Sequence, residues 1–199
     1  MVFQTNRLRL RPIRLSDAEA MFSYAKIPTV GPKAGWSPHT LLEETKAIIR
    51  SMMKEDPANS GVFAVTLLDD KLIGTIDIHH ITKDFKGEIG LVLHPDYHNQ
   101  GLMEEASNIM IMFAFECLHL KRLEYRHFKD NFPSERLRQK LLFQYEGLLR
   151  NGFLMPDKTL KDTVVSALTD DDYFFRHAAH FKALKKKLVI ASCIDTTGI

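Results

Sequence analysis

The sequence predicts an α+β protein in which helices cover both faces of a mixed, mostly antiparallel sheet. Three consecutive segments, 62–68, 71–82 and 87–93, follow a two-residue hydrophobic period and are joined by short polar turns. This pattern is typical of an antiparallel meander. A strand, a helix and a further strand are predicted after the apolar helix that contains 109–115, which indicates that one part of the sheet is parallel and that its two halves diverge.

Composition and charge limit the classes of protein that fit. At 199 residues and 45% hydrophobic content the chain can bury one core, so one domain is expected. A net charge of +2 is too small to indicate a general membrane or nucleic-acid partner. The basic run 182–187 is expected to be a solvated helix face, and a nucleic-acid contact is the alternative. The two cysteines lack metal-ligand spacing, so no metal is expected.

The N-terminus carries arginines where a secretory signal would need apolar residues, and the apolar run 109–115 is too short to span a bilayer. We therefore expect a cytoplasmic protein.

The first part of the chain predicts one strand and two helices. Near alternation of leucine and arginine over 8–14 indicates a strand with one buried face. Capping-box spacing at 16–19 begins a helix that runs to 26. The segment 27–36 holds two prolines and two glycines and must be a loop, after which Ser37-Pro38 is expected to start a helix that runs to 52.

The second part predicts a helix to about 120, a strand over 123–128, a helix over 134–142, and strands over 145–151 and 163–168. The last segment places Phe174, Phe175, Ala178, Phe181 and Leu184 at helical spacing. This amphipathic helix could dock on the chain's own core or on a second subunit, so a homodimer is possible.

One stretch, 88–106, joins a short strand to a helix through a polar loop with a single glycine, Gly101. Such a loop leaves backbone N–H groups without partners and directs the positive end of the helix dipole at the gap, so it can hold a phosphate. A single glycine before a helix is more often only a turn.

This stretch resembles the acetyl-CoA loop, Q/R-x-x-G-x-G/A, of the GNAT superfamily of N-acetyltransferases. Further landmarks are Thr5-Asn6-Arg7-Leu8-Arg9-Leu10-Arg11-Pro12, Ile73-Gly74, Glu88-Ile89-Gly90, Glu105-Ala106, Asn131-Phe132-Pro133-Ser134 and Phe143-Gln144-Tyr145-Glu146-Gly147. Together they resemble the RimJ/RimL branch, which acetylates ribosomal-protein N-termini. The resemblance implies a GNAT domain over 1–173 with splayed central strands, a C-terminal extension over 174–199, and transfer of acetyl from acetyl-CoA to a primary amine by direct attack.

The resemblance also implies the cofactor-binding residues. Backbone N–H groups of the loop would hold the pyrophosphate, and the strand before the loop would bind the pantetheine arm as an added strand would. The implied residues are Leu91, Val92, Leu93, His98, Asn99, Gln100, Gly101, Leu102, Met103 and Asn131. Alternatively, 91–93 is a plain buried strand.

Two catalytic residues are implied. Ser134 would protonate the leaving thiolate, or it would cap its helix. Glu88 would be the general base if its pKa is tuned toward neutrality, or it would be an edge-strand glutamate in an ion pair. His79 and His80 are adjacent, so only one is expected to reach the cleft. The strand position that holds the base in the ribosomal-protein enzymes is occupied here by Phe153.

Several residues depart from the family's pattern. Met103 replaces a glycine or alanine, Glu104 replaces a threonine, His98 replaces the leading arginine or glutamine, and Leu142 replaces a glycine. These departures favour an alternative in which the protein is a catalytically weak CoA-ester sensor or a protein-binding scaffold. The acceptor is expected to be a protein N-terminus or a small-molecule amine, and the loop from Ile27, with Trp36 and His39, is expected to line its pocket.

Overall fold

The computed structural model of the protein describes residues 1–54 and 61–187. One mixed sheet of eight strands, in the order β1-β2-β3-β4-β5-β6-β8-β7, organises the fold. The strands are β1 (Phe3–Gln4), β2 (Leu8–Pro12), β3 (Phe63–Leu67), β4 (Leu72–Thr82), β5 (Lys86–Leu93), β6 (Arg122–Phe128), β7 (Gln144–Leu154) and β8 (Leu160–Thr169). The helices are α1 (Ala18–Ala25), α2 (Leu42–Met52), α3 (Leu102–Glu116), α4 (Phe132–Lys140) and α5 (Ala178–Lys187).

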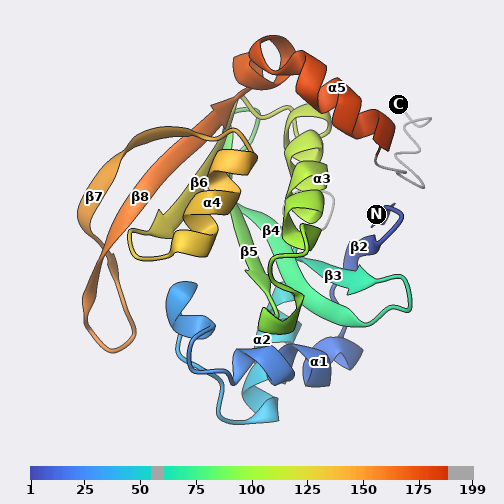
Figure 1. Cartoon of the computed structure of the whole chain (residues 1–199). Coiled ribbons are helices and arrows are strands. Elements are labelled where there is room, and N and C mark those ends of the chain that lie inside the picture. The colour runs from blue at the N-terminus through green and yellow to red at the C-terminus, as the bar shows by residue number, and fades with distance from the viewer. Residues whose placement is uncertain (55–60, 188–199) are drawn as a thin grey trace.

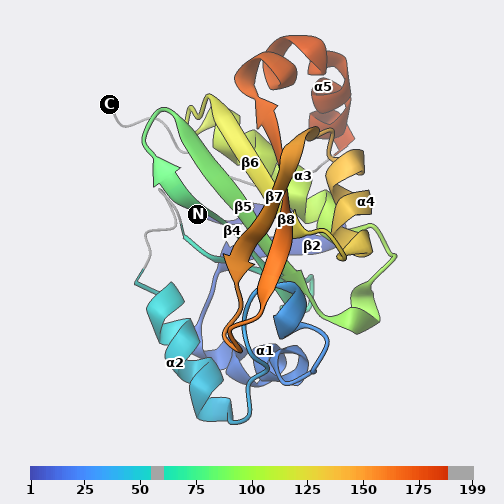
Figure 2. The same ribbon diagram turned by 90° about the vertical axis from the view of Figure 1, so that its left-hand side faces the viewer.

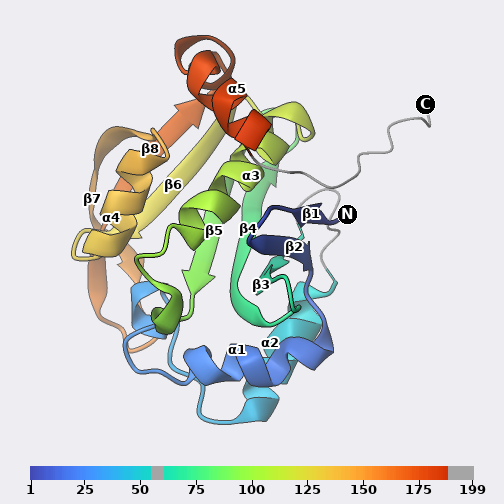
Figure 3. The ribbon, with the colours of Figure 1, turned by 45° about the vertical axis from the view of Figure 1, so that its right-hand side comes forward.

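The predicted fold class is confirmed. All neighbouring strands pair antiparallel except β5 and β6, which are parallel because α3 crosses over between them. Two hydrophobic clusters form the core: one packs α3 against the centre of the sheet, and the other packs α1 and α2 against the opposite face. Figures 1 and 3 show α3 and α4 together on one face of the sheet.

The parallel pairing ends early. Residues Lys86–Ile89 of β5 pair with residues Arg122–Tyr125 of β6. After Ile89 and Tyr125 the two strands are no longer paired with each other. Figure 3 shows the two strands diverging below α3 and α4. The structure therefore contains the splayed central strands that the family resemblance implied.

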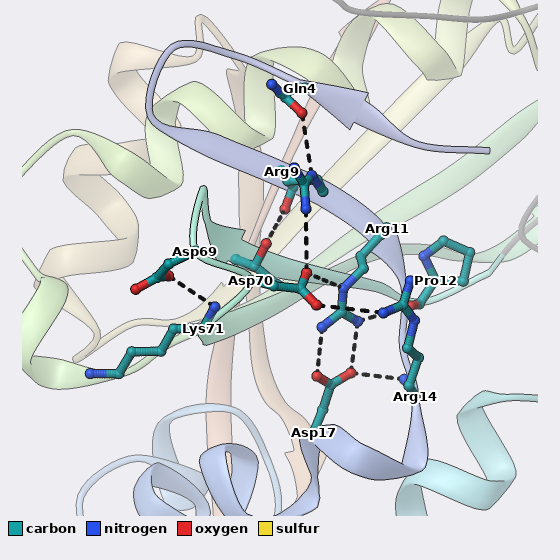
Figure 4. A network of polar contacts seen from close by, with 10 residues as sticks. Gln4, Arg9, Arg11, Pro12, Arg14, Asp17, Asp69, Asp70 and Lys71 are labelled. Atoms are coloured by element: carbon teal, nitrogen blue, oxygen red, sulfur yellow. Dashed lines mark hydrogen bonds and ion pairs between the residues drawn. The ribbon is translucent and has the colours of Figure 1, made fainter.

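A network of arginines and aspartates ties β2 to α1 and to the turn between β3 and β4 (Figure 4). The Arg11 guanidinium donates to both carboxylate oxygens of Asp17, at 2.9 and 2.7 Å, and to Asp70 at 2.7 Å. Asp17 also accepts the backbone N–H of Arg14 at 2.8 Å. Since Arg11 and Asp17 are both buried, each neutralises a charge that would otherwise be desolvated without a partner.

Some boundaries differ from the predictions. α2 begins at Leu42 rather than at 38, because the Glu44 carboxylate accepts the N–H of Thr40 and Leu41, at 2.7 and 3.4 Å. The N–H of His39 bonds instead to the carbonyl of Ala25 at 3.0 Å. α4 begins at Phe132, two residues before the predicted start, and β7 and β8 extend beyond the predicted strands. β1 was not predicted, and β2 ends at Pro12, before the predicted end at 14.

The C-terminal helix α5 packs on the chain's own core. Phe181 is buried, and the ring of Tyr173 stacks on Phe115 of α3 with centroids 5.0 Å apart. The Tyr173 hydroxyl donates to Glu116 at 2.7 Å. The sequence left open whether this helix docks on the chain's own core or on a second subunit, and the structure shows it on the chain's own core. The basic run 182–187 lies on α5, and residues 188–199 of the predicted extension lie outside the described part of the chain.

We predict that Asp17→Ala lowers the free energy of unfolding by about 3 kcal/mol, because it leaves the buried Arg11 charge with only the more exposed Asp70. Urea denaturation followed by circular dichroism measures this loss. Arg14→Ala is the matched control, since its exposed guanidinium lies 3.5 Å from Asp70, and it should cost no more than about 0.5 kcal/mol. Equal losses in both variants would contradict a specific role for the buried pair.

Candidate active site

The glycine loop lies between the end of β5 and the start of α3. Asn99 and Gly101 both have positive φ, +60° and +73°, and Gly101 immediately precedes the helix. The first helical hydrogen bond runs from the N–H of Glu105 to the carbonyl of Gly101 at 3.0 Å. The N–H groups of residues 102–104 therefore have no acceptor within the helix, as an anion site requires.

Side chains hold this loop in place. The imidazole Nε2 of His98 lies 3.1 Å from the carbonyl oxygen of Leu93, and Gln100 donates to the carbonyl of Asp96 at 3.0 Å. Arg7, from the segment between β1 and β2, donates to the carbonyl of Gln100 at 3.0 Å. His98 therefore braces the loop against β5 through its side chain.

The departures at the start of α3 do not fill the loop. Met103 is 6% exposed and its side chain lies in the core cluster around α3, away from the exposed loop residues Asn99 and Gln100. Glu104 pairs with Lys140 of α4 at 2.9 Å. The Met103 side chain is thus buried away from the loop, and the charge of Glu104 is paired with Lys140. The free N–H groups at the helix start therefore fit the pyrophosphate of a CoA ester.

Glu105 is also compensated. Its carboxylate accepts hydrogen bonds from Thr5 and from Arg7, the latter through Nε at 2.8 Å. Two landmarks that are distant in the sequence therefore meet at the loop and place a guanidinium beside it. Arg7 and Lys140 had not been assigned a role from the sequence, because only the fold brings them to this helix end.

Successive residues at the end of β5 point their backbone N–H and C=O groups alternately toward β4 and toward the opening beside β6. The N–H of His94 bonds to the carbonyl of Ile73 in β4 at 2.8 Å, and a Cβ at Gly74 would lie 2.3 Å from the carbonyl oxygen of Val92. Since alternate residues of a strand address opposite neighbours, Val92 bonds toward β4. Leu91 and Leu93 therefore turn their backbone groups toward the opening, where His98 already occupies the Leu93 carbonyl.

Ser134 lies across the opening on α4, and its expected role as helix cap is wrong. The cap is Asn131, whose side-chain oxygen accepts the N–H of Ser134 at 3.4 Å. The Ser134 hydroxyl is instead 2.8 Å from the hydroxyl of Tyr125 in β6. Burial raises the Tyr125 pKa to about 12, and the hydrogen bond with Ser134 only partly opposes this shift. The two hydroxyls therefore stay protonated near neutral pH.

Arg138 stabilises α4 from the same side. It donates to Glu135 through Nε and Nη2, at 3.0 and 2.6 Å, and to the carbonyl of Phe143 at 2.6 Å. His127 places Nε2 2.9 Å from the same Glu135 carboxylate. The hydrogen bond from Arg138 outweighs desolvation and lowers the Glu135 pKa to about 2. This network fixes the helix that carries Ser134.

Glu88 lies on the other face of the sheet. Ile89 packs in the α3 cluster and Val92 against the α1–α2 cluster, so Glu88, Gly90 and Val92 share the face that α1 and α2 cover. Tyr125 belongs to the α3 cluster. Ser134, which bonds to Tyr125, and Glu88 therefore address the parted strands from opposite faces.

Glu88 is surrounded by cationic groups. Its carboxylate lies 3.7 Å from His79 Nε2, 3.6 Å from His80 Nδ1 and 3.3 Å from Arg126 Nε. Burial raises the Glu88 pKa, but hydrogen bonding with His79 and the nearby positive charges outweigh it, and the net pKa is lowered. The expected tuning toward neutral pH is therefore wrong, and the alternative of an ion-paired glutamate describes this residue.

Both histidines reach Glu88, which contradicts the expectation that only one could. The pairing register between β4 and β5 shifts between His79 and Thr82, and His80 has a φ of +50°. This bulge turns two adjacent side chains to one face. Burial lowers the His79 pKa, but hydrogen bonds to Asp77 and Glu88 outweigh it and raise the value to about 10.

The segment between α1 and α2 contacts the β7–β8 hairpin. Figure 2 shows the β7–β8 hairpin reaching down to it. A Cβ on Gly35, whose φ is +88°, would lie 2.7 Å from the ring of Phe153, and that ring packs on Phe128 with centroids 5.2 Å apart. Phe153 is thus a packing residue. Trp36 and His39 lie beside each other, with ring centroids 5.2 Å apart.

Comparison with known proteins defines the family. A family model described as "Acetyltransferase (GNAT) domain" matches residues 7–144. The uncharacterized N-acetyltransferase YoaA of Bacillus subtilis (strain 168) is 31% identical over 170 residues, which cover 84% of this chain and 96% of YoaA. The uncharacterized N-acetyltransferase p20 of Bacillus licheniformis is 32% identical over 152 residues, covering 74% of this chain and 84% of p20.

Solved structures agree with this assignment. An acetyltransferase (GNAT family) from Bacillus anthracis superposes with a TM-score of 0.77 at 24% identity, covering 86% of this chain and 99% of that one. A structure described as a "putative ribosomal-protein-serine acetyltransferase" from Vibrio cholerae has a TM-score of 0.73 at 26% identity, covering 85% and 97%. The chain belongs to the GNAT family and is an acetyltransferase; this family uses acetyl-CoA as co-substrate. No helix within 1–54 or 61–187 could span a membrane.

We predict that Glu135 makes the protein sensitive to acid. Its folded pKa of about 2 lies below the usual value, so the stability it contributes is present above about pH 4.5 and lost as pH falls toward 2. Glu135→Gln should therefore show a smaller loss of stability between pH 5 and pH 3 than the wild type, measured by urea titrations at each pH. Glu19→Gln, at an exposed position of α1, should retain the wild-type slope. Identical slopes for Glu135→Gln and the wild type would contradict the prediction.

Proposed function

We propose that the chain moves an acetyl group from acetyl-CoA to a primary amine by direct attack in a ternary complex. The observation that carries this proposal is the opening between β5 and β6, with a glycine loop at its end and polar residues on both faces. A donor on the α3–α4 face and an amine on the α1–α2 face can meet through such an opening. The N–H groups of residues 102–104, which have no acceptor within the helix, and the backbone groups of Leu91 and Leu93 support this placement of the donor. The N–H of His98, expected to take part, bonds instead to the carbonyl of Pro95 at 3.0 Å.

In the proposed reaction, bound acetyl-CoA supplies a thioester whose carbonyl carbon the amine attacks. The N–H of Leu91 points to the open side and would polarise that carbonyl, as an oxyanion hole does. A C–N bond forms, the C–S bond breaks and the amine loses one proton to water. The Ser134 hydroxyl, held by Tyr125 at 2.8 Å, would give its proton to the thiolate and regain one from water, which balances the proton that the amine released.

The amine side of the proposed site favours an acceptor that loses its proton readily. Glu88 has a lowered pKa and is a weak base, and Phe153 occupies the strand position of the family's usual base. An α-amino group, with a pKa near about 8, needs less help than a lysine side chain near about 10.4. We therefore propose a protein or peptide N-terminus as the acceptor.

The RimJ/RimL branch fits this acceptor. Support comes from the Vibrio cholerae structure and from a Bacillus subtilis (strain 168) protein described as "Putative ribosomal N-acetyltransferase YdaF", which is 30% identical over 94 residues and matches 47% of this chain. Membership of this branch, the cytoplasmic location, the homodimer and the division of the chain at residue 173 all stay predictions.

A CoA-ester sensor is the second candidate. The observation that favours it is the lowered pKa of Glu88, which leaves the amine side without a base tuned to neutral pH. A sensor would bind acetyl-CoA without releasing free CoA when amines are added. The same experiment therefore distinguishes the two functions.

The test measures acetyl-CoA binding by calorimetry and thiol release with peptides that differ in their N-terminal residue. We expect Ser134→Ala to bind acetyl-CoA within about twofold of the wild type and to lower kcat about 10²-fold. Tyr125→Phe should lower kcat less, because Ser134 keeps its own proton. Ser23→Ala on α1, whose hydroxyl bonds only to the carbonyl of Ala20, is the control and should leave kcat unchanged.

Failure to bind millimolar acetyl-CoA would contradict both functions. Binding without thiol release for any peptide or small amine would contradict the transferase and support the sensor. An unchanged kcat in Ser134→Ala would remove Ser134 from the proposed proton path.

A further inference from the structure

Three potential metal-ligating groups converge on the face of the sheet opposite Ser134. They are Nε2 of His79, Nδ1 of His80 and the carboxylate of Glu88, and one ligand atom of each lies within 4.8 Å of the others. His79 and His80 come from the end of β4, and Glu88 from the facing residue of β5. Acetyl transfer as proposed above requires neither imidazole of this cluster as a proton carrier.

The spacing of these groups fits a transition metal. The distances from the Glu88 carboxylate to His79 Nε2 and His80 Nδ1 are 3.7 and 3.6 Å. Ligands of a tetrahedral zinc ion, bound at about 2.0–2.1 Å, are separated from one another by about 3.4 Å. Small side-chain rotations would therefore bring the three groups to bonding distance. Two imidazoles and one carboxylate, with a further position open, are a ligand set that Zn²⁺ accepts.

His79 has the outer contact that metal-binding histidines generally have. Its Nδ1 lies 2.7 Å from the Asp77 carboxylate, which orients the ring and leaves Nε2 directed at Glu88. Gly90, the β5 residue paired with Asp77, leaves space for the Asp77 and His79 side chains. A Cβ at Gly90 would lie 2.6 Å from Asp77 Oδ1 and 3.0 Å from His79 Cε1.

His80 reaches the cluster only because of a strained backbone. Its φ of +50° is uncommon for a residue other than glycine, and such conformations concentrate at functional sites. The side chain is 79% exposed, so burial of its ring does not explain the bulge. What the bulge achieves is a second imidazole beside the first, with ring centroids 4.6 Å apart.

Arg126 is the cation that now lies beside Glu88, at 3.3 Å. A metal ion would have to displace it from this carboxylate. Arg126 has a second partner in Glu124, whose Oε2 accepts from Nη2 at 2.7 Å. The guanidinium can therefore leave Glu88 without becoming an unpaired charge.

We propose that His79, His80 and Glu88 bind one divalent transition-metal ion, with Zn²⁺ the ion they fit best and Asp77 as the outer partner of His79. This site lies on the α1–α2 face of the sheet, opposite the face proposed for acetyl-CoA, and does not depend on the proposed transfer reaction. A bound ion would occupy Glu88 on the face from which the amine approaches.

The test titrates tag-free, chelator-treated full-length protein with ZnCl₂ and follows binding by calorimetry and by competition with a chromophoric chelator. We expect one Zn²⁺ per chain with a dissociation constant of 10 μM or tighter, on the order of −7 kcal/mol. His80→Asn should weaken binding at least about tenfold, because asparagine tolerates the positive φ but lacks the imidazole. Glu88→Gln should weaken it as well.

His119→Asn is the matched control, because His119 is also exposed and also has a positive φ, +52°, at the turn after α3. It should bind Zn²⁺ as the wild type does. Binding weaker than millimolar, unchanged affinity in His80→Asn, or equal weakening in His119→Asn would each overturn the proposal. Acetyl-CoA binding in His80→Asn should equal that of the wild type, which separates failure of the metal site from failure of the proposed transferase.

Discussion

The parallel pairing of β5 with β6 stops at Ile89, and the arrangement of the candidate site follows from that interruption. A strand inside a sheet normally satisfies its backbone groups on both sides, and unpaired groups away from water are costly. Here the interruption leaves Leu91 and Leu93 with one side open in the middle of the sheet. His98 satisfies one of these groups, the carbonyl of Leu93, and thereby fixes the glycine loop to the strand. An extended ligand arm can satisfy the others as an added strand does.

The same interruption leaves an opening through which groups on the two chemically different faces of the sheet can meet. On the α3–α4 face the residues near the opening are hydroxyls and free amide groups, which suit a thioester and a leaving thiolate. On the α1–α2 face they are carboxylates, imidazoles and a guanidinium around Glu88. Gly90 is on this same face and, having no side chain, leaves room for Asp77 and His79. In the proposed reaction, the hydrogen-bond donors of the α3–α4 face therefore bind the acyl donor, and the charged α1–α2 face receives the amine.

Local patterns in the sequence predicted the elements whose causes are local. The meander over β3, β4 and β5 has a clear two-residue period, and Gly101 has the positive φ that only its flexibility makes easy. Leu142, at a position where the family pattern has glycine, also has a positive φ of +66°, the backbone conformation that glycine adopts most readily. The splayed strands were predicted from family resemblance, because no periodicity reports where pairing ends.

Other features could not be predicted because long-range contacts decide them. The start of α2 depends on where the Glu44 carboxylate finds partners, and capping by Asn131 left the Ser134 hydroxyl free for Tyr125. The bulge at His80 depends on pairing with β5, so strict alternation placed His79 and His80 on opposite faces, whereas both lie beside Glu88. The tuning of Glu88 was mispredicted because strand pairing decides its neighbours: the β4–β5 register places His79 opposite it, whose hydrogen bond contributes most to the lowered pKa, and β6 adds the charge of Arg126.

The central claim is that the open backbone groups of β5 bind acetyl-CoA, and residue-resolved amide hydrogen exchange tests it most directly. Saturating acetyl-CoA should slow exchange at Leu91, Leu93 and residues 102–104, while Val92, already bonded toward β4, should change little. Unchanged exchange at Leu91 and at the start of α3 with the ligand bound would contradict the account.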